Sequence, residues 1–155
     1  MSLIQQLISE LKSTERDLVK VAQKSIEDNL DFIMFLLKEK QLGEGIMSDG
    51  GSAPRYNPLT AEYAKLNPPR TGASSKSSSN TFNYEWTGKW IDSLYAVLDN
   101  EGFTILSGDW KTEILENRSG GKITALTEEN NDIVNKEIVV PALAEHIFRK
   151  MDKFI

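Results

Sequence analysis

The chain has 155 residues and a mass of 17.4 kDa, and 39% of its residues are hydrophobic, so it is long enough to bury one core without disulfide or metal support. Its 18 basic and 23 acidic side chains leave a net charge of −5, which disfavours a nucleic-acid-binding protein held by phosphate neutralisation. With no cysteine and one histidine, His146, thiolate chemistry, disulfides and His-rich metal clusters are excluded. Neither a signal peptide nor a membrane-spanning run is recognisable, and we expect one soluble, intracellularly made domain over residues 1–155.

The N-terminal segment, from Ser2 to about Leu42, predicts a long amphipathic helix that ends at Gly43 and Gly45. Its apolar residues recur at helical spacing: Leu3, Leu7, Leu11, Leu18, Ala22, Ile26, Leu30, Ile33 and Leu37. An unbroken helix of about 38 residues would be ~57 Å long, whereas a compact chain of this size has a radius of gyration of ~15 Å. We therefore expect either a break at Ser13–Thr14 or a projecting end that packs against another subunit.

A stretch rich in Gly, Ser, Pro and Asn follows over about residues 43–82 and predicts a flexible loop. Within it, Arg55–Lys65 predicts a short helix that is capped by Thr60 and stopped by Pro68 and Pro69. Because a loop of this length is unusual in a small domain, we expect it to be functional or to be ordered by a partner.

The next segment, Trp86–Leu94, predicts a short helix with Thr87 as its cap. Tyr95–Leu98 and Phe103–Leu106 then flank the turn-forming Asp99–Gly102, which predicts an antiparallel β-hairpin. The pattern of Lys111–Ala125 is ambiguous, and Ile123–Leu126 is compatible with a further short strand.

The C-terminal segment begins at Thr127, which predicts a helix N-cap followed by acidic residues that suit the helix dipole. An apolar stripe then continues to the C-terminus: Ile133, Val134, Ile138, Leu143, Ile147, Phe148 and Met151. Pro141 predicts either a bend near Val139–Pro141 or two helices with Pro141 in the first turn of the second. This order of elements predicts an α+β fold with a small antiparallel sheet.

No catalytic, cofactor or metal site is predicted. The short Gly-containing stretches lack the spacing of a phosphate-binding loop, and a lone His146 among helical residues is typical of a structural histidine. Paired carboxylates such as Glu113 and Glu116 arise by chance in a chain with 23 acidic residues.

Aromatic and basic residues alternate around the loop: Tyr56, Tyr63, Phe82, Tyr84, Trp86 and Trp90 lie among Arg55, Lys65, Arg70, Lys76 and Lys89. Such a pattern suits a surface that stacks single-stranded nucleic acid. Residues 43–94, however, contain five basic and five acidic side chains, so we favour core and interface packing.

Two stretches carry a family resemblance. Gly51–Lys65 is similar to the Pro, aromatic, x-Pro-Leu-Ser/Thr-x-x-Tyr-Ala-x-x-Lys stretch of tail-completion and virion-morphogenesis proteins of tailed bacteriophages. Trp86–Leu94 resembles the Leu-Thr-Gly-x-Leu-x-x-Ser-Leu/Ile stretch that follows in that family. The order of helix, loop, Thr-Gly helix, hairpin and final helix also fits over about residues 3–153, while Trp110–Leu126 and the Ser-rich Ala73–Asn80 depart from the family pattern.

The resemblance implies a structural protein without catalysis or cofactor, which forms a homo-oligomeric ring at the neck or upper tail of the virion and joins the DNA-filled head to the tail. A hexamer is one candidate ring. Implied partners are the neighbouring head-connector and tail-tube proteins, with DNA passing through the lumen without specific binding, no membrane contact, and assembly in the host bacterial cytoplasm. The expected interface residues are Arg55, Tyr56, Leu59, Tyr63, Trp86, Thr87, Gly88 and Trp90. Thr87 would cap the helix, and Gly88 would permit close backbone approach.

Two other functions remain open from the sequence. One is a small adaptor that docks on a partner protein through the long helix. The other is a carboxylate-dependent hydrolase or nuclease, for which Asp109, Glu113 and Glu116 are the candidate metal ligands.

Overall fold

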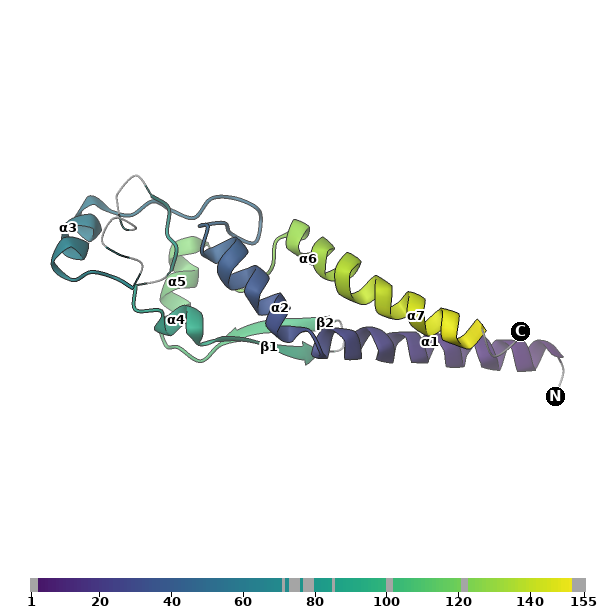
Figure 1. Ribbon diagram of the computed structural model, residues 1–155. Coiled ribbons are helices and arrows are strands. Elements are labelled where there is room, and N and C mark those ends of the chain that lie inside the picture. The colour runs from purple at the N-terminus through teal and green to yellow at the C-terminus, as the bar shows by residue number, and fades with distance from the viewer. Residues whose placement is uncertain are drawn as a thin grey trace.

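The computed structural model describes residues 3–70, 72, 76, 80–84, 86–99, 102–120 and 123–151. The molecule is elongated (Figure 1). Helix α1 (Leu3–Glu27) and helix α7 (Val140–Met151) run side by side at one end, and α3 (Pro58–Leu66) and α5 (Thr112–Ser119) lie at the other end. The mixture of helices with one antiparallel hairpin confirms the predicted α+β class.

The predicted break at Ser13–Thr14 is wrong, because α1 runs through these residues without interruption. The chain turns instead at Asp28–Asn29, where the Asn29 side-chain amide donates to the carbonyl of Ser25 at 2.8 Å. Helix α2 (Leu30–Phe35) begins after this turn. The long α1 projects from the body, and the chain's own α7 lies along it (Figure 1). Packing of the projecting end against another subunit stays a prediction.

A π-helical segment, η1 (Leu36–Leu42), continues α2 and packs into the core. Its Gln41 side chain is fully buried; it donates to the carbonyl of Ala125 at 2.8 Å and accepts from the amide of Thr127 at 2.9 Å. Since a buried amide needs all its partners, Gln41 joins η1 to the start of the C-terminal helices.

The loop after η1 is shaped by backbone hydrogen bonds. Gly45 has a φ of +71° and its carbonyl accepts from the amide of Ala53 at 2.7 Å. Ile46 forms an isolated bridge with Ser52. Part of the Ser-rich stretch, residues 73–75 and 77–79, lies outside the described residues.

Helix α3 does not start as predicted. Its N-cap is Asn57, whose side chain accepts from the amide of Leu59 at 2.9 Å, and Pro58 occupies the first helical position. Thr60 lies inside the helix, so the prediction of Thr60 as the cap is wrong. Proline suits the first turn because its missing N–H would have no partner there.

The predicted hairpin is confirmed as β1 (Leu94–Asp99) and β2 (Gly102–Ser107), which pair antiparallel with Leu94 opposite Ser107. One face carries the buried Leu94 and Ile105 into the core. The ambiguous stretch after the hairpin contains α5, and Ile123–Leu126 is not a strand, because Ile123 and Leu126 enter the core from an irregular segment.

The C-terminal rod consists of α6 (Glu128–Val134), the π-helical η3 (Asn135–Val139) and α7. Thr127 is the N-cap as predicted, since its hydroxyl accepts from the amide of Asn130 at 3.1 Å. Pro141 is the second residue of α7, directly after the wide π turn. A proline cannot donate an intrahelical hydrogen bond, and the altered bonding of η3 accommodates the predicted kink at this point.

The hydrophobic core lies where α2, η1, the hairpin and the α6–η3 rod meet. Its fully buried apolar side chains include Ile33, Leu37, Leu42, Ile91 and Ile123. Within the described ranges, no helix has the length and apolarity needed to cross a bilayer.

Candidate interaction site

Six aromatic side chains, which we call the aromatic cluster, gather at the end of the molecule opposite α1 and α7: Tyr56, Tyr63, Phe82, Tyr84, Trp86 and Trp90. The ring centroids of Tyr56 and Phe82 are 4.7 Å apart, and those of Tyr84 and Trp90 are 5.4 Å apart. Phe82 and Tyr84 meet edge to face at 6.2 Å, and Tyr63 packs on Trp86 at 5.6 Å. The fold therefore brings the two stretches that carry the family resemblance into contact.

Backbone pairing aligns the two stretches. Arg55 forms an isolated antiparallel bridge with Thr81, the amide of Phe82 donates to the carbonyl of Pro54 at 2.8 Å, and the amide of Tyr56 donates to Asn80 at 3.1 Å. This short antiparallel contact places Tyr56 next to Phe82, although 25 residues, helix α3 among them, separate the two in the chain.

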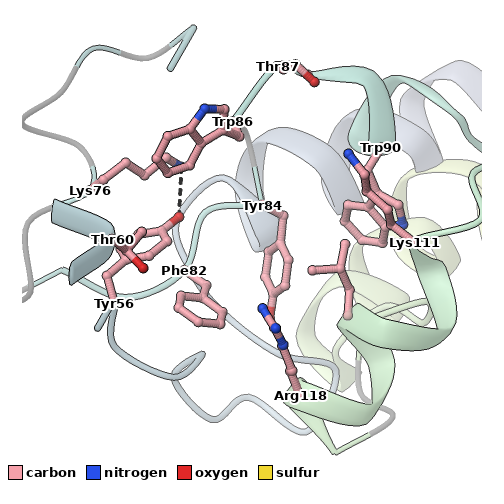
Figure 2. Close-up of a pocket in the computed structure, with 12 residues that line it drawn as sticks. Tyr56, Thr60, Lys76, Phe82, Tyr84, Trp86, Thr87, Trp90, Lys111 and Arg118 are labelled. Carbon is pink, nitrogen blue, oxygen red and sulfur yellow. Dashed lines mark hydrogen bonds between the residues drawn. The ribbon is translucent and has the colours of Figure 1, made fainter. Parts of the chain in front are cut away.

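All rings of the cluster except that of Tyr63 line a cavity of about 220 Å³, which we call the aromatic pocket (Figure 2). Its lining combines aromatic rings with basic and small side chains: Tyr56, Thr60, Lys76, Phe82, Tyr84, Trp86, Thr87, Gly88, Trp90, Lys111, Leu115 and Arg118. Leu115 and Arg118 come from α5 and Lys111 is its N-cap residue, so four separate segments build the pocket.

Lys76 is the most deeply buried basic residue of the site, with only 1% of its surface exposed. Its ammonium donates to the Tyr56 hydroxyl at 2.7 Å and to the side-chain carbonyl of Asn83. The same nitrogen lies 4.8 Å from the centroid of the Tyr56 ring and 5.8 Å from that of Trp86, and Figure 2 shows its side chain reaching across from the loop to meet these rings. A buried ammonium needs such contacts to offset its lost hydration, so Lys76 fixes the loop against the cluster.

Gly88 has a φ of +78° and lies under the guanidinium of Arg70. A β-carbon at this position would stand 2.4 Å from the Arg70 Nη1 atom. The same guanidinium pairs with Asp92 at 3.2 Å. The close approach at Gly88 is thus made by an arginine side chain and not, as predicted from the sequence, by backbone.

Thr87 is not the helix cap that the sequence predicts. The N-cap position of α4 (Lys89–Asp92) is Gly88, and no side chain caps it. The Thr87 hydroxyl is 3.4 Å from the amide of Lys89, a long and weak hydrogen bond. The left-handed conformation of Gly88 turns the chain before Thr87 can take the usual cap geometry.

Trp90 belongs mainly to the core. It is 4% exposed, and its indole nitrogen donates to the Thr112 hydroxyl at 3.1 Å. That hydroxyl also contacts the Ser107 hydroxyl at 2.7 Å. These bonds tie α4 and α5 to the end of the hairpin.

Tyr84 is the one described residue other than glycine with a positive φ, at 57°. Its hydroxyl lies 2.7 Å from the Ser119 hydroxyl on α5. Burial raises the pKa of the Tyr84 hydroxyl, so it stays protonated and neutral at physiological pH.

A second feature, which we call the α3 apolar face, adjoins the pocket. Leu59 and Leu66 are 77% and 82% exposed, and Tyr63 is 56% exposed. Their spacing of four and three residues places them along one side of the helix. Leu59, Tyr63 and Trp86 also line a shallow hollow that shares Thr60 and Trp86 with the aromatic pocket.

The structure thus brings together seven of the eight predicted interface residues, in the aromatic pocket, the hollow or both. The eighth, Arg55, has an exposed side chain and contributes its backbone bridge. Sequence reasoning missed the α5 contribution, although Lys111, Leu115 and Arg118 have the four- and three-residue spacing of one helix face. It also missed Leu66 on α3.

Two of the three residues proposed as metal ligands, Asp109 and Glu116, accept hydrogen bonds within the protein. Asp109 accepts a hydrogen bond from the amide of Lys111 at 2.8 Å, and Glu116 accepts from the Thr124 hydroxyl at 2.7 Å. In the part of the chain that the structure describes, no group of three or more His, Asp or Glu residues is arranged to hold a metal ion.

No protein-family model, curated protein or solved structure matches this chain.

Proposed function

We propose that this chain is a structural virion protein without catalytic activity, a subunit of a ring at the head–tail junction or upper tail of a tailed bacteriophage. In this role it joins the DNA-filled head to the tail. The observation that carries the proposal is the convergence of the two stretches of family resemblance in the aromatic pocket and the α3 apolar face. If the two stretches form one binding surface, that common role explains why both match the sequence pattern of the same family.

The elongated shape supports assembly with neighbours. Exposed apolar side chains lie at both ends of the molecule: Val19, Ile147 and Phe148 on α1 and α7, and Leu59 and Leu66 on α3. Contiguous apolar surface exposed on a small protein usually marks an interaction site. Two distinct contact regions at opposite ends allow head-to-tail association, which closes into a ring when the rotation between neighbours is right.

The net charge of −5 suits a ring through which DNA passes, because a basic lumen would hold the phosphates. In this proposal the neighbouring head-connector and tail-tube proteins bind the faces of the ring, and DNA makes no specific contact.

The test is the solution mass of the purified protein, measured by light scattering over a range of concentrations and followed by negative-stain imaging. We expect a closed species of about six or more subunits with a central hole. A monomer at every concentration would contradict self-assembly of the isolated subunit. Such a result would put the adaptor on equal standing with the ring subunit, and a defined 1:1 or 2:2 complex with one partner is the product expected of the adaptor.

A further inference from the structure

The aromatic pocket differs in charge from the chain as a whole. Three of its lining residues are basic, namely Lys76, Lys111 and Arg118, and none of its described lining residues is acidic. The chain itself carries a net charge of −5. Arg118 on α5 and Lys111, the N-cap residue of α5, both have exposed side chains. The Lys111 ammonium lies 5.6 Å from the centroid of the Trp110 ring, a contact that leaves its charge able to pair with a carboxylate.

The size and walls of the pocket suit one large apolar side chain. Five aromatic rings and Leu115 line a volume of about 220 Å³. An engineered apolar cavity of ~150 Å³ admits a benzene molecule, so a phenylalanine or leucine side chain fits this space. Burial of such a group against aromatic rings is favourable, and it gives preferred ring geometries.

The surface beside the pocket is larger than a single side chain needs. Trp86 and Thr60 line both the pocket and the shallow hollow, and the hollow continues to Leu59 and Tyr63 on α3. A ligand that covered both would therefore be an extended segment and not a small molecule.

We propose that the aromatic pocket binds an acidic peptide segment of a partner protein, in which one aromatic or large aliphatic side chain is flanked by aspartate or glutamate. The apolar side chain enters the pocket, and the flanking carboxylates pair with Lys111 and Arg118. The neighbouring residues of the segment cover the hollow over Leu59 and Tyr63. This inference rests on the proposed function insofar as it takes this surface to be a protein interface, and it adds the chemistry of the partner.

The charge complementarity also supplies specificity. Charges at the rim of an interface contribute little to affinity one by one, but they select against partners of the wrong sign. Lys76 is held by Tyr56 and Asn83, so it fixes the pocket wall before a ligand binds. Lys111 and Arg118 then select the ligand by its charge.

The experiment uses the full chain labelled with 5-fluorotryptophan, which gives one fluorine signal for each of Trp86, Trp90 and Trp110. Trp86 and Trp90 line the pocket, whereas Trp110 is 75% exposed and outside it. The probe is the blocked pentapeptide Glu-Asp-Phe-Asp-Glu. We expect it to shift the signals of Trp86 and Trp90 saturably at concentrations below about 1 mM. Trp110 should shift less, because it meets the bound peptide only through the Lys111 ammonium, which lies 5.6 Å from the centroid of its ring.

Four comparison ligands separate the sources of binding. The amide version, Gln-Asn-Phe-Asn-Gln, should bind about tenfold more weakly if the carboxylates matter, and Glu-Asp-Gly-Asp-Glu should not shift the two signals. Free 3-phenylpropionate that binds as tightly as the acidic peptide would overturn the peptide assignment in favour of a small-molecule site. Displacement of the peptide by oligo(dT) at equal concentration would overturn it in favour of nucleic acid.

Variants test the two cations. The double substitution Lys111→Gln and Arg118→Gln should weaken the peptide about tenfold, whereas Lys89→Gln, an exposed lysine outside the lining, should leave affinity within about twofold. Equal binding by the wild type and the double variant, or no shift of Trp86 and Trp90 at several millimolar peptide, would overturn the proposal. The fluorine signals are readable in a monomer and in a ring, so loss of peptide binding is distinguishable from loss of assembly, which the solution mass reports.

Discussion

Replacing Gly45 by alanine should destabilise the protein by about 3–4 kcal/mol. The residue has a φ of +71°, and a left-handed conformation costs a residue with a β-carbon about 1–2 kcal/mol. The added β-carbon would also stand 2.2 Å from the Thr81 Oγ1 atom and 3.0 Å from the carbonyl oxygen of Phe82. Thr81 is held by its bridge to Arg55, so the backbone has to shift, and overpacking of this kind costs about 1–3 kcal/mol.

Gly50 offers a matched control in the same loop. Its φ is +78°, and no atom lies within 4 Å of a β-carbon placed there. Gly50→Ala should therefore carry only the backbone cost, about 1–2 kcal/mol. The difference between the two variants isolates the steric contact of Gly45 with residues 81 and 82.

Urea unfolding followed by circular dichroism measures the free energy of unfolding of both variants. For a chain of this size, the loss of stability expected for Gly45→Ala corresponds to a fall in Tm of about 10 °C. Thr81→Ala removes the closest atom, so the Gly45→Ala/Thr81→Ala double variant should lose less stability than the sum of the two single variants, by about 1 kcal/mol. Equal losses for Gly45→Ala and Gly50→Ala, together with additive behaviour in the double variant, would refute the steric reasoning.

Three further predictions concern the core, the surface and the helix pair. Gln41→Leu should cost about 3 kcal/mol in urea unfolding, because it leaves buried backbone groups at the start of α6 without partners. Leu59→Ser combined with Leu66→Ser should leave the unfolding free energy within about 0.5 kcal/mol and reduce the mass of the assembled species in light scattering. The Lys150 hydrogen bond holds the pKa of Asp17 below its ordinary value of 3.8, so this pair stabilises the fold above that pH and its contribution is lost as the pH falls through the lowered pKa. Lys150→Gln should therefore reduce the loss of stability between about pH 4 and pH 2, as measured by urea unfolding at each pH.

Each of these tests has a control and a contrary result. A loss below about 1 kcal/mol for Gln41→Leu would mean that water satisfies the exposed groups. Lys65→Ser lies on the same helix as the two leucines, and an equal effect on the assembled mass would contradict a role for the α3 apolar face. Lys89→Gln removes an exposed charge on α4 and should leave the loss of stability at acid pH unchanged. If that variant reduced the loss as Lys150→Gln does, the effect could not be attributed to Asp17.

The local patterns of the sequence predicted the hairpin, the Thr127 cap and the effect of Pro141, because each depends on residues close together in the chain. The turn at Asp28–Asn29 was not predictable from periodicity, since the apolar spacing continues across it from Ile26 to Ile33. Tertiary packing determines the turn, because α1 and α2 can bury Ile26 and Ile33 in one core only if the chain bends between them. At α3, the Asn57–Pro58 pair is the stronger start signal, and it outweighs Thr60.

The candidate site was predictable in part. The family resemblance selected Tyr56, Trp86 and Trp90, which the structure places around one pocket. The burial of Lys76 depends on partners supplied by residues 56 and 83, and a lysine in a Ser-rich stretch gives no local sign of it. Arg118 enters the site through α5, whose sequence pattern is ambiguous because both of its faces carry polar residues.

The π-helical segment η3 has a consequence for how α7 meets α1. A π segment is equivalent to a helix with one residue inserted, and each residue rotates an α-helix by about 100°. Removing one residue from Asn135–Val139 would restore regular bonding and rotate the face of α7 that carries Lys150 away from Asp17. The extra residue therefore sets the rotation of the last helix about its axis, and with it which side chains the outer end of the molecule exposes at its surface.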